Sequence, residues 1–247
     1  NYTAISVPAP PPVSQYKTAY LYKTWPGAVT ATSADDGTTV TLYYFGGQWV
    51  ISTYRGYQVN SFTWAAGKTY QEIVDDVLAK YGVKYDSLDK KLSYSFGFRH
   101  YLYHPFQAEE NKITAWFIQS VDIEKFNSGD ENYVNYADNM GLPAQITQTF
   151  KSLRELFNLA RDAYGEFKES KTVNYGYLVR VNGRQHLIES SLLRNIRQIF
   201  YSNRFNKLDA VYDKRRYTIV YSFLDSEKHD VFKILFTQYS EQFGKLS

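Results

Sequence analysis

A short stretch of alternating polar and apolar residues places the strongest constraint on the fold of this chain. Residues 38–45, TTVTLYYF, are rich in Thr, Val and Tyr, which is typical of a strand with one buried face. Gly46 and Gly47 supply the two positive-φ positions that a tight turn requires. Residues 48–54 then run back as the partner strand, so the sequence predicts a β-hairpin.

The rest of the chain mixes helical and strand-like patterns. The clearest helix covers 69–81, where apolar residues recur every 3.6 residues and Thr69 with Glu72 forms a capping box before Gly82. Strands are predicted over 16–22, 92–103, 112–121, 175–180 and 217–223, with a partner strand starting at His186 and ending at Glu189. Helices are predicted over 149–168, 191–201 and 227–243, and a polar loop over 126–141.

The first residues are dominated by proline. Four of the seven prolines lie between Pro8 and Pro12, which predicts an extended polyproline arm. This arm is either a flexible tail or a segment laid across a partner. The chain begins at Asn1 rather than Met, so we expect either a processed protein or a fragment. A removed signal peptide is one of the alternatives.

The composition excludes several classes of function. With no cysteine, the chain has no disulfides, no thiol catalysis and no cysteine metal site. A net charge of +3 gives no large basic field of the kind that marks a general nucleic-acid binder. No apolar run approaches the roughly 20 residues of a membrane helix, so no membrane partner is expected. The 24 Tyr and 16 Phe residues favour sheet faces and protein interfaces.

Four short motifs occur in a suggestive order along the chain. Residues 34–37, ADDG, enter the hairpin, and residues 52–56, STYRG, leave it. Residues 96–99, FGFR, are followed by His104-Pro105, and residues 175–180, YGYLVR, come later. This order resembles the nucleotide-binding core of the covalent nucleotidyltransferases, which include RNA ligases, DNA ligases and mRNA capping guanylyltransferases. Phage-type RNA ligases and related proteins of large DNA viruses are the most similar.

The resemblance covers roughly residues 16–200 and implies an α+β fold of antiparallel sheets flanked by helices. It divides the chain into a proline-rich arm over 1–15, a nucleotidyltransferase-like domain over 16–200 and a small, helical C-terminal subdomain over 201–247. In members of this family, a lysine attacks the α-phosphate of ATP or GTP and becomes covalently nucleotidylated.

The residues that the family uses for chemistry are missing here. Ala34 stands where the motif Lys-x-Asp-Gly has its nucleophilic lysine. Arg99 and Tyr175 stand where two glutamates are expected, and Leu187 and Glu189 lie where a Lys-x-Lys binds the phosphates. Metal-assisted phosphoryl transfer needs carboxylates for Mg²⁺ and cations for phosphate. The resemblance therefore predicts no catalytic residue, no cofactor and no metal.

Other family positions are retained and outline a former nucleotide cleft. They are Asp35, Asp36, Gly37, Arg55, Gly56, Gly176 and Arg180. We expect this cleft to be narrowed, with Tyr175 and Arg99 pointing inward and Arg99 pairing with Asp35 or Asp36.

The expected function is a catalytically inactive, ligase-like domain reused as a binding or structural module in a large DNA virus. Protein partners are expected, and the location is the cytoplasm or the virus particle. One alternative is an active RNA ligase or guanylyltransferase, using ATP or GTP with Mg²⁺, with Lys23 or Lys68 as a displaced nucleophile. Another is an RNA-binding protein whose phosphate contacts are made by arginines, namely Arg55, Arg180, Arg184, Arg194 and Arg197.

We expect structural roles for a histidine pair and for a short basic run. His100 and His104 could share a strand edge, but two histidines without a nearby carboxylate make a poor metal site. The basic run 214–216, KRR, is typical of a solvated turn, with phosphate contact as the alternative.

Overall fold

The computed structural model describes the protein as an α+β fold with two larger antiparallel sheets and one of two strands in its described residues, which confirms the predicted class. It describes residues 3–12, 27–34, 37–65, 67–100, 113–137, 139–161, 175–181 and 184–191. These residues form two compact units, which we name after their sheets. The five-stranded unit contains 3–11, 37–100 and 113–146, and the four-stranded unit contains 12, 27–34, 147–161 and 175–191.

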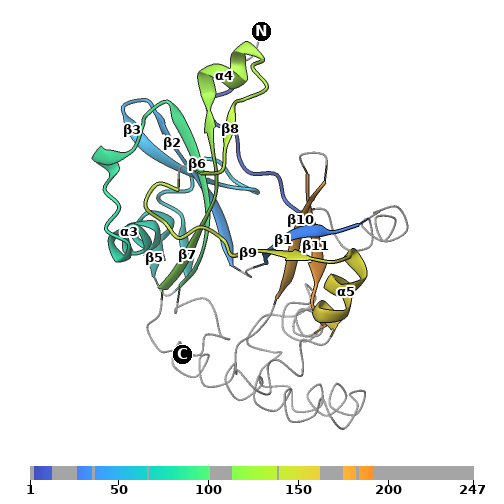
Figure 1. The fold of residues 1–247 in the computed structure, drawn as a ribbon. Helices are drawn as coiled ribbons and strands as arrows, with labels where there is room; N and C mark the ends of the chain where they lie inside the picture. Colours follow the sequence, from blue (N-terminus) through green and yellow to red (C-terminus); the bar gives the residue numbers. More distant parts are fainter. Residues whose placement is uncertain are drawn as a thin grey trace. The chain divides into compact units, whose positions relative to one another are not determined.

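The five-stranded unit is built around the predicted hairpin. Its sheet has the order β3-β2-β6-β7-β8 (Figure 1) and consists of β2 (Thr38–Phe45), β3 (Gln48–Thr53), β6 (Leu92–His100), β7 (Ile113–Asp122) and β8 (Val134–Asn135). Its smaller elements are β4 (Thr63–Ala65), β5 (Lys68–Thr69), α3 (Tyr70–Lys80), η1 (Tyr85–Ser87) and α4 (Ile123–Ser128).

Helix α3 closes one face of this sheet. Its capping box is present as predicted, because the Thr69 hydroxyl accepts from the Glu72 amide and the Glu72 carboxylate accepts from the Thr69 amide. The apolar stripe of α3 packs with strand residues in one core, which contains Val40, Leu42, Ile51, Ile73, Val74, Val77, Leu78, Phe96, Phe98 and Phe117. Burial of this stripe orients the helix on the sheet.

The opposite face of β6 is polar and contacts the N-terminal arm. Ser93 and Ser95 are fully buried, although both are hydroxyl residues. The Val7 amide donates to the Ser93 hydroxyl at 3.4 Å, and the Ala9 amide donates to the Ser95 hydroxyl at 3.0 Å. The described part of the proline-rich arm therefore lies on its own five-stranded unit, in contrast to the free tail or partner contact expected from the sequence.

The four-stranded unit has the strand order β11-β10-β1-β9. Its elements are β1 (Val29–Ser33), β9 (Thr147–Phe150), α5 (Leu153–Arg161), β10 (Gly176–Val181) and β11 (Arg184–Glu189). Helix α5 packs on the sheet through a second core, formed by Val29, Ala31, Phe150, Leu153, Leu156, Ala160, Val179 and Ile188.

Most predicted elements in the described part are present, but two predictions are wrong and one strand was missed. The helix expected over 149–168 begins only at Leu153, because residues 147–150 pair with β1 as a strand. The loop expected over 126–141 contains the end of α4 and strand β8. Strand β1 was not predicted at all. The strands predicted over 16–22 and 217–223, most of the helix at 191–201, the helix at 227–243 and the run 214–216 lie outside the described residues.

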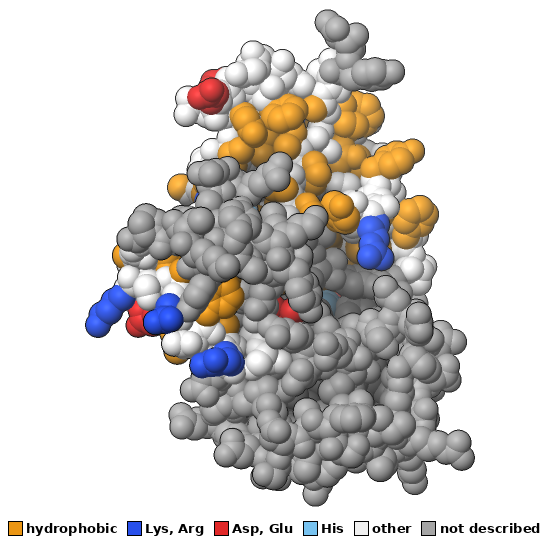
Figure 2. All heavy atoms as spheres, turned by 90° about the vertical axis from the view of Figure 1, so that its right-hand side faces the viewer, with side chains coloured by type: hydrophobic (Ala, Val, Ile, Leu, Met, Phe, Trp, Pro, Cys, Tyr) orange, Lys and Arg blue, Asp and Glu red, His pale blue; other side chains and the backbone are white. Residues whose placement is uncertain are grey.

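Hydrophobic side chains gather on one part of the molecular face drawn in Figure 2, with few charged side chains among them. Among the described residues, several large aromatic side chains are more than half exposed. Phe45 is 52% exposed, Tyr54 75%, Tyr57 80% and Phe62 59%, and all four belong to the five-stranded unit.

Candidate functional site

The four-stranded unit brings several former cleft positions together. The Ala34 amide donates to the Gly176 carbonyl at 2.9 Å, and Gly176 pairs in register with Glu189. Ala34 and Tyr175 are both buried. Ala34, which the resemblance aligns with the nucleophilic lysine, is therefore a small, buried residue whose backbone is hydrogen-bonded to β10.

The remaining residues that the resemblance singles out in this unit lie on β10 and β11. Leu187 lies opposite Leu178, and both are half-buried. Arg180 is exposed near the other end of β10 and lies opposite Gln185. No lysine replaces the missing phosphate-binding pair on β11, whose sequence is RQHLIE. Of the predicted arginine contacts, Arg184 opens β11, and Arg194 and Arg197 lie outside the described residues.

In the five-stranded unit, three residues surround one indole ring: Gly37 of the expected cleft, Gly97 and Arg99. A Cβ atom built on Gly97 would lie 2.2 Å from the Trp116 ring, and one built on Gly37 would lie 2.5 Å from it. The Arg99 guanidinium lies over the same ring, at 5.7 Å from the centroid. Trp116 is therefore enclosed by two glycines and a cation, an arrangement that stabilises the ring through packing and a cation–π contact.

Trp116 was missed by the sequence analysis. A glycine inside a strand often marks a close approach of another group, so Gly97 was the available indication. It did not identify the partner, because the pairing of Gly97 with Trp116 depends on the register of β6 and β7. Arg99 was expected to pair with Asp35 or Asp36, which lie outside the described residues. The Arg99 guanidinium makes a cation–π contact with Trp116.

The motif that leaves the hairpin forms a tight turn. The Thr53 amide donates to the Gly56 carbonyl at 2.7 Å, and the Thr53 hydroxyl accepts from the amides of Arg55 and Gly56. The Arg55 side chain is exposed. Tyr175 and Arg99 belong to different units, and the predicted narrowing of the cleft stays a prediction.

A second cluster of ionisable groups joins α3 to the strands. The Lys68 ammonium and the buried His100 imidazole both contact the Asp76 carboxylate, and the His100 contact measures 3.3 Å. The expectation that His100 lacks a nearby carboxylate is therefore wrong. Burial lowers the pKa of His100 below its ordinary value, against the effect of Asp76. Burial would raise the pKa of Asp76, but its hydrogen bonds from Lys68 and His100 outweigh this and lower it.

We expect mild acid to destabilise the protein through His100. The unfolded chain keeps the ordinary histidine pKa of about 6.5, whereas the folded chain has a lower one. The unfolded state then binds the proton more readily, so the free energy of unfolding falls as pH decreases below about 6.5 and is unaffected by this group at higher pH. Urea denaturation at pH 7.5 and pH 5.5 measures the effect. A His100→Gln control should show a smaller difference, and an equal difference in both proteins would contradict the assignment.

The described residues contain neither a metal-binding cluster nor a membrane-spanning helix. Among them, no group of three or more His, Asp or Glu side chains is arranged to hold a metal ion. No helix in the described ranges has the length and apolar character needed to cross a bilayer.

Several viral proteins are similar in sequence to this chain. A protein of African swine fever virus named "Putative RNA-ligase" is 22% identical over 283 residues, which cover 99% of this chain and 62% of that protein. The protein of the same name from another isolate of the virus is 23% identical, with the same coverage. The chain thus spans about three-fifths of the length of the relatives that it matches. No family model matches the chain.

Solved structures of ligases are also similar to this chain. The "Putative ATP-dependent DNA ligase from Aquifex aeolicus" gives a TM-score of 0.49 at 8% identity, covering 96% of this chain and 66% of the ligase. An archaeal ATP-dependent RNA ligase gives a TM-score of 0.47 at 11% identity, covering 94% and 62%. The sequence similarity to the viral proteins extends along nearly the whole chain, and it confirms the resemblance of this chain to the RNA ligase-like nucleotidyltransferases.

Proposed function

We propose that this chain is a catalytically inactive, RNA ligase-like domain that serves as a binding module. The observation that carries the proposal is Ala34 at the position of the nucleophilic lysine. A methyl group has no lone pair to attack a phosphate, so this position cannot form a covalent nucleotide intermediate. Arg99 and Tyr175 also replace the two carboxylates that a catalytic Mg²⁺ would need.

The packing of the five-stranded unit supports this proposal. Trp116 fills the space between Gly37 and Gly97, and the N-terminal arm covers Ser93 and Ser95 on the same face of β6. These contacts stabilise the fold and use a sheet face for internal packing. They favour a structural role for this face over the binding of a nucleotide.

The surface supports protein partners. Four exposed aromatic side chains on one unit provide apolar area that a partner would bury. Because the relatives named above are viral proteins, we propose a viral origin and a role in the virus particle or in the cytoplasm of the infected cell.

The alternative of an active enzyme requires a displaced nucleophile. Lys23 lies outside the described residues, and Lys68 forms a salt bridge with Asp76. A neighbouring carboxylate favours the protonated ammonium, which has no lone pair for attack. This geometry makes Lys68 a poor nucleophile. RNA binding through Arg55 and Arg180, which are both exposed, remains a second candidate, and its affinity would fall steeply with salt.

Incubation with labelled ATP or GTP and Mg²⁺ tests the main proposal. We expect no covalent adduct with the natural chain, and none with Ala34→Lys, because the carboxylates and phosphate-binding lysines are still missing. Thermal unfolding should establish that the variant is folded, since Ala34 is buried.

An acid-labile adduct on the natural chain would overturn the proposal, and its loss in Lys68→Ala would identify the nucleophile. An adduct that appears only with Ala34→Lys would show that the rest of the site is intact. That result would overturn the inference from positions 99 and 175.

A further inference from the structure

Three side chains of the five-stranded unit hold the N-terminal arm, residues 3–12, by hydrogen bonds. They are Ser93 and Ser95 of β6 and Asn127 of α4, and we name them the arm site. The Ala4 amide donates to the Asn127 side-chain oxygen at 2.9 Å, and the Asn127 amide group donates back to the Ala4 carbonyl at 3.0 Å. In each hydrogen bond described between the arm and this unit, the arm contributes a main-chain atom.

The arm site pairs with the main chain much as a neighbouring strand would. The Ser93 hydroxyl accepts from the Val7 amide and donates to the Val7 carbonyl at 3.5 Å. Asn127 likewise engages both the amide and the carbonyl of one arm residue. Such paired exchange is the pattern of antiparallel strands, made here by side chains that each carry a donor and an acceptor. The site therefore recognises an extended backbone rather than particular side chains.

The prolines of the arm are spaced to suit this recognition. Val7 and Ala9 donate their amides to hydroxyl groups that are likewise two residues apart on β6. Pro8 and Pro10 alternate with them and are exposed. Proline has no N–H, so these outward positions leave no amide unpaired. Each donating residue also precedes a proline, which restricts it to extended backbone before it docks.

The arm lies on the unit without joining its core. Its described residues are half-buried or exposed, and Ile5 is 45% exposed. The two described core clusters are formed by residues outside the arm. A segment with few buried apolar contacts opens at low cost in free energy. The arm therefore has the properties of a tethered ligand.

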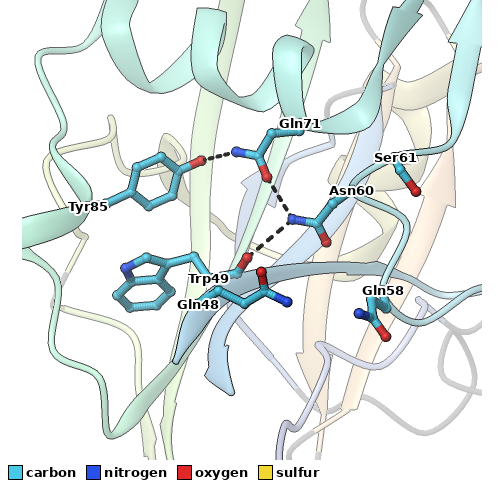
Figure 3. A pocket seen from close by; sticks show the side chains of 7 residues that line it. All are labelled: Gln48, Trp49, Gln58, Asn60, Ser61, Gln71 and Tyr85. Carbon is cyan, nitrogen blue, oxygen red and sulfur yellow. Dashed lines mark hydrogen bonds between the residues drawn. The ribbon is translucent and has the colours of Figure 1, made fainter. Parts of the chain in front are cut away.

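The pocket drawn in Figure 3 belongs to the same unit but is stabilised by its own residues. The Trp49 ring packs against three tyrosine rings, and the Asn60 amide group bridges the Trp49 carbonyl and the Gln71 side-chain oxygen. These contacts join β3 to α3, so we give this pocket a structural role. The arm site differs because its partner is a separate, peripheral segment.

We propose that the arm site is a peptide-binding site for extended segments in which free amides alternate with prolines. The arm of this chain is its resident ligand and blocks it in the isolated protein. A protein partner with the same alternation gains access by displacing the arm. This proposal rests on the proposed function, because it names a ligand class for the binding module.

A full chain with a released arm tests the proposal. Val7→Pro and Ala9→Pro together remove the two arm amides that donate to β6. A natural peptide of residues 1–12 is then titrated while the NMR signals of the arm site are followed. We expect saturable binding to this variant and at least about 10-fold weaker binding to the natural chain. The tethered arm competes there at an effective concentration on the order of millimolar.

Peptide variants test the role of the alternating amides. Ala9→Pro in the peptide removes the amide that Ser95 accepts, so its affinity for the released chain should fall about 3- to 10-fold. Pro12→Ala is the matched control, because Pro12 is exposed and lies beyond the paired residues. It should leave the affinity unchanged.

A pair of asparagine variants in the released chain tests the other side of the contact. Asn127→Ala should weaken the natural peptide about 3- to 10-fold, since two neutral hydrogen bonds are lost. Asn132→Ala, at another exposed asparagine, should have no effect. The proposal is overturned by no saturable binding to the released chain, or by equal affinities within either matched pair.

Hydrogen exchange in the natural chain gives a measurement that needs no variant. The Val7 and Ala9 amides should exchange clearly faster than the paired amides of β6, because the arm opens without unfolding the sheet. Equal protection would make the arm a permanent part of the sheet and would also overturn the proposal. A nucleotide adduct would refute catalytic inactivity without changing any of these peptide results, so the two proposals can fail separately.

Discussion

Gly176→Ala is expected to lower the free energy of unfolding by about 3 kcal/mol or more. Gly176 opens β10 with a φ of 120°, which side chains rarely tolerate. A Cβ atom at this position would lie 2.1 Å from the Ile188 carbonyl oxygen and 2.9 Å from the Ser190 amide nitrogen. Both are backbone atoms of the neighbouring segment, so relief would require separating β10 from β11.

Urea denaturation and hydrogen exchange of the β10 and β11 amides would measure this effect. Gly46→Ala is the matched control, because Gly46 has a φ of 60° and no heavy atom within 4 Å of a Cβ. It should cost only about 1 kcal/mol, from the backbone conformation alone. Equal costs at the two positions would show that the contact with β11 is unimportant.

Gly97→Ala is expected to cost about 2–4 kcal/mol, because it would place a methyl group against the Trp116 indole. The added Cβ would lie between 2.2 and 2.5 Å from three atoms of that ring. Trp116 is only 7% exposed, and its ring also packs closely against Gly37. The ring therefore has little room to shift.

A double-mutant cycle would test this explanation. In a Trp116→Leu background the added methyl group should cost clearly less than in the natural chain, since the ring it strikes is gone. Unfolding followed by circular dichroism gives each free energy. The same cost in both backgrounds would mean that Gly97 is required for another reason.

The elements that could be predicted depend on local sequence. The hairpin was read from alternation and two glycines, and helix α3 from its capping box and apolar stripe. In both, neighbouring residues supply the stabilising contacts. The structure confirms them with boundaries that differ by about one residue.

The elements that were missed depend on distant partners. Residues 29–33, VTATS, carry few large apolar side chains, and β1 exists because β9 and β10 pair with its two edges. For the same reason, Thr149 and Phe150 continue the helical pattern of α5 but form a strand. Local periodicity cannot reveal such pairing.

The candidate site shows the same division. The resemblance implies replaced family residues at positions 34, 99 and 175, because the residue types there supply neither an amine nucleophile nor a carboxylate. The enclosure of Trp116 could not be predicted, because it brings together residues from different elements.

The interleaving of the two units along the chain has a consequence for how the protein folds. The five-stranded unit is drawn from three separate segments, and β1 pairs with β10, more than a hundred residues later. Contacts of such high sequence separation require costly loop closure before they contribute stability, so folding should be slow. A single truncation cannot release either unit intact, and experiments on one unit need a circular permutation or a designed linker.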